Sequence, residues 1–296
     1  MSKTPPPTLA PVVSVFNMKG GVGKTIIAAN LFRELYRNIG SKKKTLLIDF
    51  DAQFNLTQQV LNQTDYDALL AKKKTIWFVM EPEAPDSIFV TSRSDLEDVG
   101  SPFDYTTRLK YTVAPDNSEL HLLPGDFQMA MLNLREKPES LQLPRKRFAN
   151  LIRRAREECA LVVLDCNPSS SFLTHCAVEN STHLLVPVRP DKYSLRGLEM
   201  AAQYVGKLPG MRHRPEILII FNGVGVKESE VEQAVLAHPE YGPCVLKTRI
   251  RTTAVLAARS DYTGFGADRG VKNTKTIRGV LTLASIELAK RLGIQI

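Results

Sequence analysis

Seven consecutive residues near the amino terminus have the composition of a phosphate-binding loop. They read Lys19-Gly-Gly-Val-Gly-Lys-Thr25 and lie between an apolar run and a segment with helical spacing. Glycines let the backbone wrap closely around a phosphate, and the helix that follows presents free N–H groups and its positive dipole end. In such a loop Lys24 neutralises the β- and γ-phosphates, and the Thr25 hydroxyl binds Mg²⁺. The sequence therefore predicts a site for a magnesium nucleotide.

Carboxylates follow two further apolar runs. Asp49 and Asp51 come directly after residues 45–48, and Asp165 follows residues 160–164. Acids at the carboxyl ends of parallel strands lie at the edge where ligands bind. Phosphoryl transfer needs one carboxylate for Mg²⁺ and another for the attacking water. We expect Asp165 to act on Mg²⁺ through a bound water, Asp49 to support the Mg²⁺ site, and Asp51 to position the water that attacks the γ-phosphate.

The elements that must position these residues alternate between strand and helix. Expected strands are 11–16, 45–48, 120–123, 160–164, 183–188 and 216–221, and expected helices are 25–38, 145–158 and about 274–292. This alternation is typical of an α/β protein. It predicts a mostly parallel, twisted sheet with helices on both faces, as in P-loop NTPases.

The composition is that of an ordinary folded protein. Over 296 residues, 43% are hydrophobic and 24% are charged, which excludes disorder or fibrous repeats for most of the chain. There is no apolar run of transmembrane length and no secretory signal. We expect a disordered Pro-rich tail over residues 1–11 and a single domain over residues 12–296. Within that domain, residues 60–118 are expected to be a variable, insertion-like surface region.

The cysteines do not form a metal or disulfide framework. They are Cys159, Cys166, Cys176 and Cys244, without a CxxC pair. Their irregular spacing argues against a cluster shared at a dimer seam, as an iron–sulfur reductase would need. They are expected to be small buried side chains in a reducing cytoplasm.

The net charge of +8 is unevenly distributed. Residues 247–278 hold eight bases and two acids, whereas residues 81–104 hold seven acids and one base. A basic stretch with no interleaved aromatics beyond Tyr262 and Phe265 suits the phosphate backbone of duplex DNA rather than its bases. The candidate DNA contacts are Lys247, Arg249, Arg251, Lys272, Lys275 and Arg278. A second basic cluster, over residues 145–156, is expected to be the solvated face of a helix.

The loop also departs from the common G-x-x-x-x-G-K-[ST] pattern. Met18 stands where the first glycine is expected, and Lys19 follows it. In this respect the segment resembles the deviant Walker A motif, KGGxGK[ST], of the ParA/MinD class of ATPases. The resemblance implies that Lys19 reaches across an ATP-sandwiched homodimer to the partner's nucleotide. Residues 49–53 are similar to the D-x-D-P-Q motif of ParA proteins, with Ala52 in place of proline.

The resemblance covers residues 12–60 and 119–292 but not residues 60–118. Residues 165–174 look like the D-x-x-P-S loop of the family, and residues 185–198 look like its P-V-x-P-[ED]-x-x-S-x-x-G stretch. Asn222 lies where family members place an asparagine that reads the adenine. The implied ATP-binding residues are Lys19, Gly20, Gly21, Val22, Gly23, Lys24, Thr25 and Asn222.

The function that the resemblance implies is DNA segregation, for plasmid or chromosome partition. The ATP-bound homodimer would bind double-stranded DNA without sequence preference, and a ParB-like adaptor on the cargo would stimulate hydrolysis. No sequence for a helix-turn-helix domain precedes the loop, so operator binding is not expected. The protein is expected to be cytoplasmic and nucleoid-associated when ATP is bound.

Two alternatives remain open. A MinD-like regulator of cell division needs an amphipathic membrane anchor beyond the core. The final helix, with Ile286 and Leu288, is expected to pack on the sheet instead, so no membrane contact is expected. A ParA-like ATPase that positions a cargo other than DNA would have the same motifs.

Overall fold

One mixed sheet of eight strands organises the chain. The computed structural model describes residues 9–39, 44–82, 97–109, 118–208, 211, 213–257 and 262–296. The strands are β1 (Val12–Val15), β2 (Lys44–Phe50), β3 (Thr107–Arg108), β4 (Glu119–Leu123), β5 (Leu161–Cys166), β6 (His183–Val188), β7 (Glu216–Val224) and β8 (Ile250–Arg251). Their order is β3-β4-β2-β5-β1-β6-β7-β8. Only β3 and β4 pair antiparallel, so the predicted mostly parallel sheet is confirmed.

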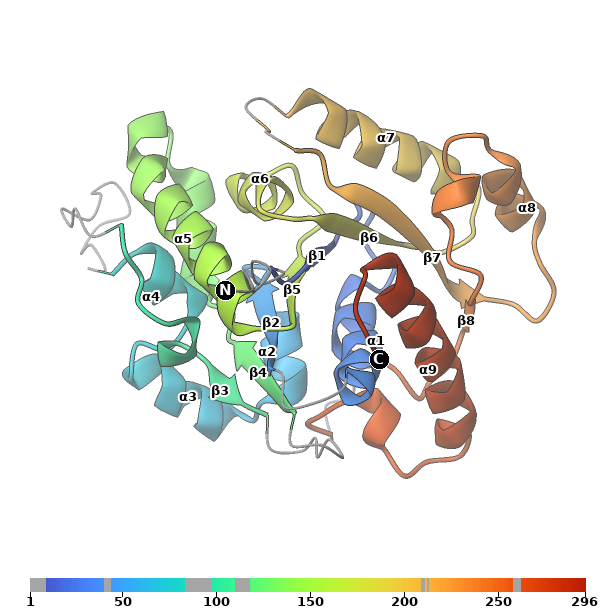
Figure 1. Cartoon of the computed structure of the whole chain (residues 1–296), viewed down its shortest axis with the longest axis horizontal. Helices are drawn as coiled ribbons and strands as arrows, with labels where there is room; N and C mark the ends of the chain where they lie inside the picture. The colour runs from blue at the N-terminus through green and yellow to red at the C-terminus, as the bar shows by residue number, and fades with distance from the viewer. Residues whose placement is uncertain are drawn as a thin grey trace, which may run out of the picture.

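Helices cover both faces of the sheet (Figure 1). One face carries α1 (Lys24–Asn38) and α9 (Thr274–Arg291), which pack against each other. The other carries α5 (Gln142–Glu158), α6 (Phe172–Glu179) and α7 (Ser194–Lys207). Successive side chains of a strand point to opposite faces of the sheet. Val13 and Val15 therefore pack in the core under α1 and α9, and Val12 packs in the core under α5.

Short helices complete the fold around this sheet. The α-helices are α2 (Asn55–Val60), α3 (Gln63–Ala71), α4 (Ile76–Met80) and α8 (Glu230–Ala237). The 3-10 turns are η1 (Pro102–Asp104), η2 (Phe127–Leu134), η3 (Pro138–Leu141), η4 (Gly242–Cys244) and η5 (Gly266–Asp268). A capping box of Ser229 and Glu232 starts α8, which satisfies two backbone N–H groups at the helix end. In the part of the chain that is described, no helix has the length and apolar composition of a membrane span.

The expectation of a surface insertion over residues 60–118 is wrong for several of its described parts. Val60, Ile76, Val79 and Met80 are fully buried, and Trp77 is 3% exposed. Helix α4 packs on β2 and α5. Five residues are too few for a helical period to appear in the sequence, which is why the apolar run of α4 was not recognised. Residues 83–96 and 110–117 lie outside the described residues.

The basic cluster of α5 is largely paired with carboxylates, and several of its side chains, such as Lys146 and Arg153, are solvent-exposed as expected. Arg147 is 2% exposed and donates to the carbonyl oxygens of Val79 and Asp98. Lys146 pairs with Glu97 at 2.7 Å, and Arg154 pairs with Asp98 at 2.8 Å. Part of the acidic stretch that precedes η1 therefore balances the charge of α5 locally.

The first ordered contacts begin before β1. Ala10 is buried and its N–H donates to the Arg156 carbonyl oxygen at 2.9 Å, and the Pro11 carbonyl accepts from Val162 N at 3.1 Å. The predicted tail over residues 1–11 is therefore too long, because Ala10 and Pro11 are part of the fold. Residues 1–8 lie outside the described residues. Cys166 and Cys176 are buried, as expected, whereas Cys159 and Cys244 are only partly buried.

Candidate active site

The predicted phosphate loop joins β1 to α1, at the carboxyl edge of the sheet. Gly21 and Gly23 have φ values of 73° and 90°, in the region that favours glycine. A Cβ at Gly23 would lie 2.3 Å from Asn222 Nδ2. The helix begins at Lys24, directly after Gly23. Its unpaired N–H groups and dipole make this loop a site for an anion.

Lys24 is folded into the loop. Its Nζ donates to the Asn17 carbonyl oxygen at 3.1 Å and to the Lys19 carbonyl oxygen at 3.0 Å, and the residue is 8% exposed. Burial lowers the pKa of Lys24, while the nearby Asp165, Cys166 and Asp51 act in the opposite direction. The loop itself therefore holds this amine in the position where a phosphate group would meet it.

Two carboxylates lie opposite each other on neighbouring strands. Asp49 of β2 and Asp165 of β5 are partners in the strand register. The Asp49 carboxylate accepts from Thr57 N at 2.8 Å and from Thr57 Oγ1 at 2.7 Å. Burial raises the pKa of Asp49 to about 7, although these hydrogen bonds lower it. Asp49 is thus fixed by α2 and reinforces the negative potential beside Asp165.

Asp165 has the features of a buried cation ligand. Neither of its carboxylate oxygens has a hydrogen-bond partner of normal geometry in the described part of the chain, and the residue is 1% exposed. Burial, followed by the charge of Asp49, raises its pKa well above the usual range, and the Thr25 hydroxyl lowers it. A buried carboxylate without such hydrogen-bond partners suits a bound cation, provided that the other ligands of the cation come from the nucleotide and water.

Mg²⁺ fits this arrangement if the nucleotide supplies oxygens. Within the described ranges, no group of three His, Cys, Asp or Glu side chains could hold a metal ion by itself. Mg²⁺ usually takes one or two protein carboxylates and completes its shell with phosphate and water oxygens. Asp165 and the Thr25 hydroxyl would hold the ion here, and the ion would offset negative charge on the phosphates.

Asp51 lines the same cavity as the loop. The cavity has a volume of about 730 Å³, within the range of small-molecule sites. Asp51 Oδ1 accepts from Gln53 N at 2.9 Å, which leaves Oδ2 for a further partner. Burial raises the pKa of Asp51, and Lys24 lowers it. The cavity is lined by Gly20, Gly21, Gly23, Lys24, Thr25, Ile26, Asp51, Gln53, Asn55, Gln58, Gln59 and Pro168.

Lys19 lies at the rim of the loop and is held by the segment after β6. Its Nζ forms an ion pair with the Asp191 carboxylate, and it lies 5.9 Å from the ring centroid of Tyr193. Both side chains of the pair are partly exposed, Lys19 by 29% and Asp191 by 39%. A pair this exposed contributes only about 0–1 kcal/mol, so Lys19 can exchange this partner for another anion.

Two asparagines hold the loop, and only one of them was singled out from the sequence. Asn222 Nδ2 donates to the Val22 carbonyl oxygen at 2.8 Å, so in this structure its amide clamps the loop; adenine recognition stays a prediction. Asn17 was missed. Its Nδ2 donates to the Pro187 carbonyl oxygen and its Oδ1 accepts from Lys19 N. An asparagine directly after a buried strand was the available signal, but turns have the same one.

The six candidate DNA contacts divide into two groups. Arg249 pairs with the buried Glu232 at 2.6 Å, and Arg278 pairs with Glu34 at 3.4 Å. The other four side chains have no carboxylate partner in the described part of the chain. These are Lys247, Arg251, Lys272 and Lys275, all exposed. Arg259 and Asp261, in the same basic stretch, lie outside the described residues.

Comparisons with known proteins agree with this fold and loop. An AAA domain model, AAA_31, matches residues 10–217. A "ParA family protein" of Chlamydia trachomatis is 26% identical over 70% of this chain and 69% of that protein. Among solved structures, pNOB8 ParA bound to nonspecific DNA superposes with a TM-score of 0.66 and 17% identity, over 96% of this chain and 99% of that chain.

A solved structure of an enzyme also shares the fold. Cobyrinic acid a,c-diamide synthase from Mycobacterium smegmatis, with a bound ATP analogue and magnesium, superposes with a TM-score of 0.65 and 18% identity, over 97% of this chain and 98% of that chain. These structural likenesses show the fold, and the family match covers more than half of the chain. The protein therefore belongs to the AAA_31 family of AAA domains and is a ParA/MinD-type P-loop ATPase.

Proposed function

We propose that this ATPase segregates DNA. ATP and Mg²⁺ bind at the loop and at Asp165, and two ATP-bound protomers form a sandwich dimer. The dimer binds double-stranded DNA without sequence preference and associates with the nucleoid. A ParB-like adaptor on a plasmid or chromosome stimulates hydrolysis, after which the dimer separates and leaves the DNA.

One observation carries this proposal: Lys19 lies outside the nucleotide cavity of its own protomer while it belongs to the same loop. It does not line the cavity that contains Lys24 and Asp51. Its amine is at the rim, on a weak ion pair with Asp191. At this position the Lys19 amine does not line the nucleotide cavity of its own protomer. It can instead contact a nucleotide that is bound to another protomer.

Loss of Lys19 is expected to prevent the dimer while ATP binding survives. In a symmetric dimer two such lysines would each give a charge-assisted hydrogen bond of about 1.5–3 kcal/mol. Lys19→Ala should therefore raise the dimer dissociation constant by about 10²- to 10⁴-fold. Light scattering with ATP and Mg²⁺ measures the dimer, and fluorescence of a labelled ATP analogue measures binding.

Asp191→Asn is the matched control. It removes the partner of Lys19 but leaves the amine, so dimerisation should be as strong as in the wild type or stronger. A Lys19→Ala protein that still dimerises with ATP would exclude the role of Lys19 across the interface.

DNA binding through the carboxyl-terminal part is supported by the four cations that have no carboxylate partner among the described residues. Lys275 lies in the first turn of α9, Lys272 lies just before that helix, and Arg251 ends β8. Arg249 is a poor candidate because its charge already serves the buried Glu232 of the α8 capping box. Cations without a carboxylate partner can pair with phosphates at little cost.

Removal of Lys272 and Lys275 should lower DNA affinity and its salt dependence together. If four cations in each protomer neutralise one phosphate each, the slope of log K against log salt is about −3.6 for each protomer. Lys272→Gln with Lys275→Gln should reduce it to about −1.8. Gel shift on random duplex DNA with ATP, at several salt concentrations, measures both quantities.

The control pair Lys137→Gln with Lys207→Gln removes the same charge from exposed positions elsewhere. Its slope should stay that of the wild type. A binding reaction that selects one sequence, or that needs no ATP, would contradict the proposal. Binding of anionic liposomes in place of DNA would favour a membrane regulator.

A further inference from the structure

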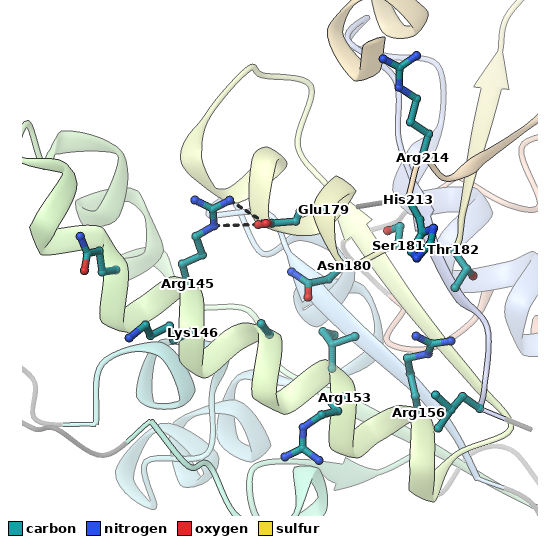
Figure 2. Close-up of a pocket in the computed structure, with 14 residues that line it drawn as sticks. Arg145, Lys146, Arg153, Arg156, Glu179, Asn180, Ser181, Thr182, His213 and Arg214 are labelled. Atoms are coloured by element: carbon teal, nitrogen blue, oxygen red, sulfur yellow. Dashed lines mark hydrogen bonds and ion pairs between the residues drawn. The ribbon is translucent and has the colours of Figure 1, made fainter. Parts of the chain in front are cut away.

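A second cavity lies at the opposite edge of the sheet from the nucleotide site. It has a volume of about 1000 Å³ and follows the length of α5 (Figure 2). Thr182 and Leu9 also line it, and they directly precede β6 and the segment that enters β1. The phosphate loop follows the carboxyl end of β1, so this cavity is at the amino ends of the same strands.

The α5 residues of this cavity form one continuous stripe. They run from Gln142 to Arg156 at intervals of three and four residues, which places them on one face of the helix. At 1.5 Å per residue the stripe is about 21 Å long. An elongated ligand of about six extended residues matches this length. We call this feature the α5 groove.

The middle of the α5 groove is apolar. Ala149 is half-buried in this part of the stripe, Ile152 lies beneath it with only 2% of its surface exposed, and Leu9 also lines the groove with 46% of its surface exposed. The small side chain of Ala149 leaves the space that the groove occupies. A ligand that fills the groove must therefore offer apolar side chains near its centre.

Further cations line the groove, and two of them have no carboxylate partner among the described residues. Arg145 is held by Glu179 through two hydrogen bonds of 2.8 and 2.7 Å, as Figure 2 shows. Among the described residues, Arg156 donates from its Nε to the Ala10 carbonyl oxygen, and Arg214 donates from one Nη to the Gly206 carbonyl oxygen. Neither Arg156 nor Arg214 pairs with a carboxylate of the described chain. Their remaining N–H groups suit bidentate carboxylates.

We propose that the α5 groove binds an extended acidic peptide segment of a partner protein. Its carboxylates pair with Arg156 and Arg214, and its apolar side chains lie against Ala149 and Leu9. The phosphate backbone of DNA would meet the two arginines but would leave the apolar floor unused, so the groove favours a peptide. This surface is additional to the proposed DNA and dimer contacts, and it is independent of the nucleotide because it lies at the other strand ends.

A labelled octapeptide tests the proposal directly. The probe has six glutamates and two central leucines, and fluorescence anisotropy measures its binding to the full chain. Arg156→Gln with Arg214→Gln should weaken binding by about tenfold or more, because each loses a charge-assisted pair. Lys137→Gln with Lys207→Gln, which removes the same charge from exposed positions outside the groove, should leave binding unchanged.

A second variant tests the hollow without changing charge. Ala149→Phe fills the groove at a half-buried position and should weaken peptide binding by a similar factor. Replacing the two leucines of the probe by serines should do the same. Binding should persist without ATP and in Lys24→Ala, which separates this proposal from the nucleotide-dependent ones.

Three results would overturn the proposal. Equal weakening in the groove pair and the control pair would mean general charge attraction. Full binding by Ala149→Phe would mean that the peptide lies elsewhere. Loss of DNA binding in the groove pair, with peptide binding retained, would mean that the groove contacts nucleic acid.

Discussion

ATP binding is expected to weaken by about 10²- to 10⁴-fold when Lys24 is replaced by Ala, because about two charge-assisted hydrogen bonds of about 1.5–3 kcal/mol each are lost. Lys24 is the cation that the loop encloses, and its amine already lies against the Asn17 and Lys19 carbonyl oxygens. Without it, the phosphates would face Asp51 and Asp165 with no protein charge between them. Titration with a fluorescent ATP analogue in the presence of Mg²⁺ measures the change.

Two controls separate this effect from misfolding. Lys207→Ala removes a lysine that is exposed on α7 and should bind ATP as the wild type does. Thermal unfolding without nucleotide should show that Lys24→Ala remains folded, since α1 and β1 keep their apolar packing. A folded Lys24→Ala protein with wild-type affinity would disprove the assignment of this loop to phosphate.

Much of the fold could be predicted because its central strands are buried on both faces. Residues 161–164 are wholly apolar, and they form β5 at the middle of the sheet; such continuous runs mark parallel strands. The elements that escaped prediction are short or lie at the sheet margin. Helix α4 has five residues and β3 has two, too few for a period or an alternation to be visible.

The loop residues and the carboxylates that the structure brings together could be picked out from the sequence, but Asn17 and the partners of these residues could not. The loop around Lys24 is formed by consecutive residues, so it could be recognised from its motif without knowing which other segments lie beside it. By contrast, Arg249 is 17 residues from Glu232, and Lys19 is 172 residues from Asp191. Which charges cancel depends on how the chain folds back on itself. For this reason the net charge of residues 247–278 indicated DNA binding but did not separate Arg249 from Lys272.

Hydrolysis is expected to slow by about 10²- to 10⁴-fold in Asp51→Ala, the usual contribution of a positioned base, while ATP binding is retained. Asp51 lies in the nucleotide cavity with Oδ2 free of the Gln53 contact. Burial raises its pKa, and a carboxylate with a raised pKa is a better acceptor for the proton of an attacking water. Phosphate release measures turnover, and light scattering measures the dimer.

The retained binding has an electrostatic cause that distinguishes Asp51 from Asp165. Removing Asp51 takes one negative charge away from a site that must accept phosphates, so ATP should bind at least as tightly and the ATP-bound dimer should persist. Asp165→Asn removes the buried carboxylate for which the described residues supply no hydrogen-bond partner of normal geometry, so it should abolish the dependence of ATP binding on Mg²⁺. Asp67→Ala, on the exposed face of α3, should change neither property. Normal turnover in Asp51→Ala would assign the water to another residue of the cavity, because the dimer could then complete its cycle without this carboxylate.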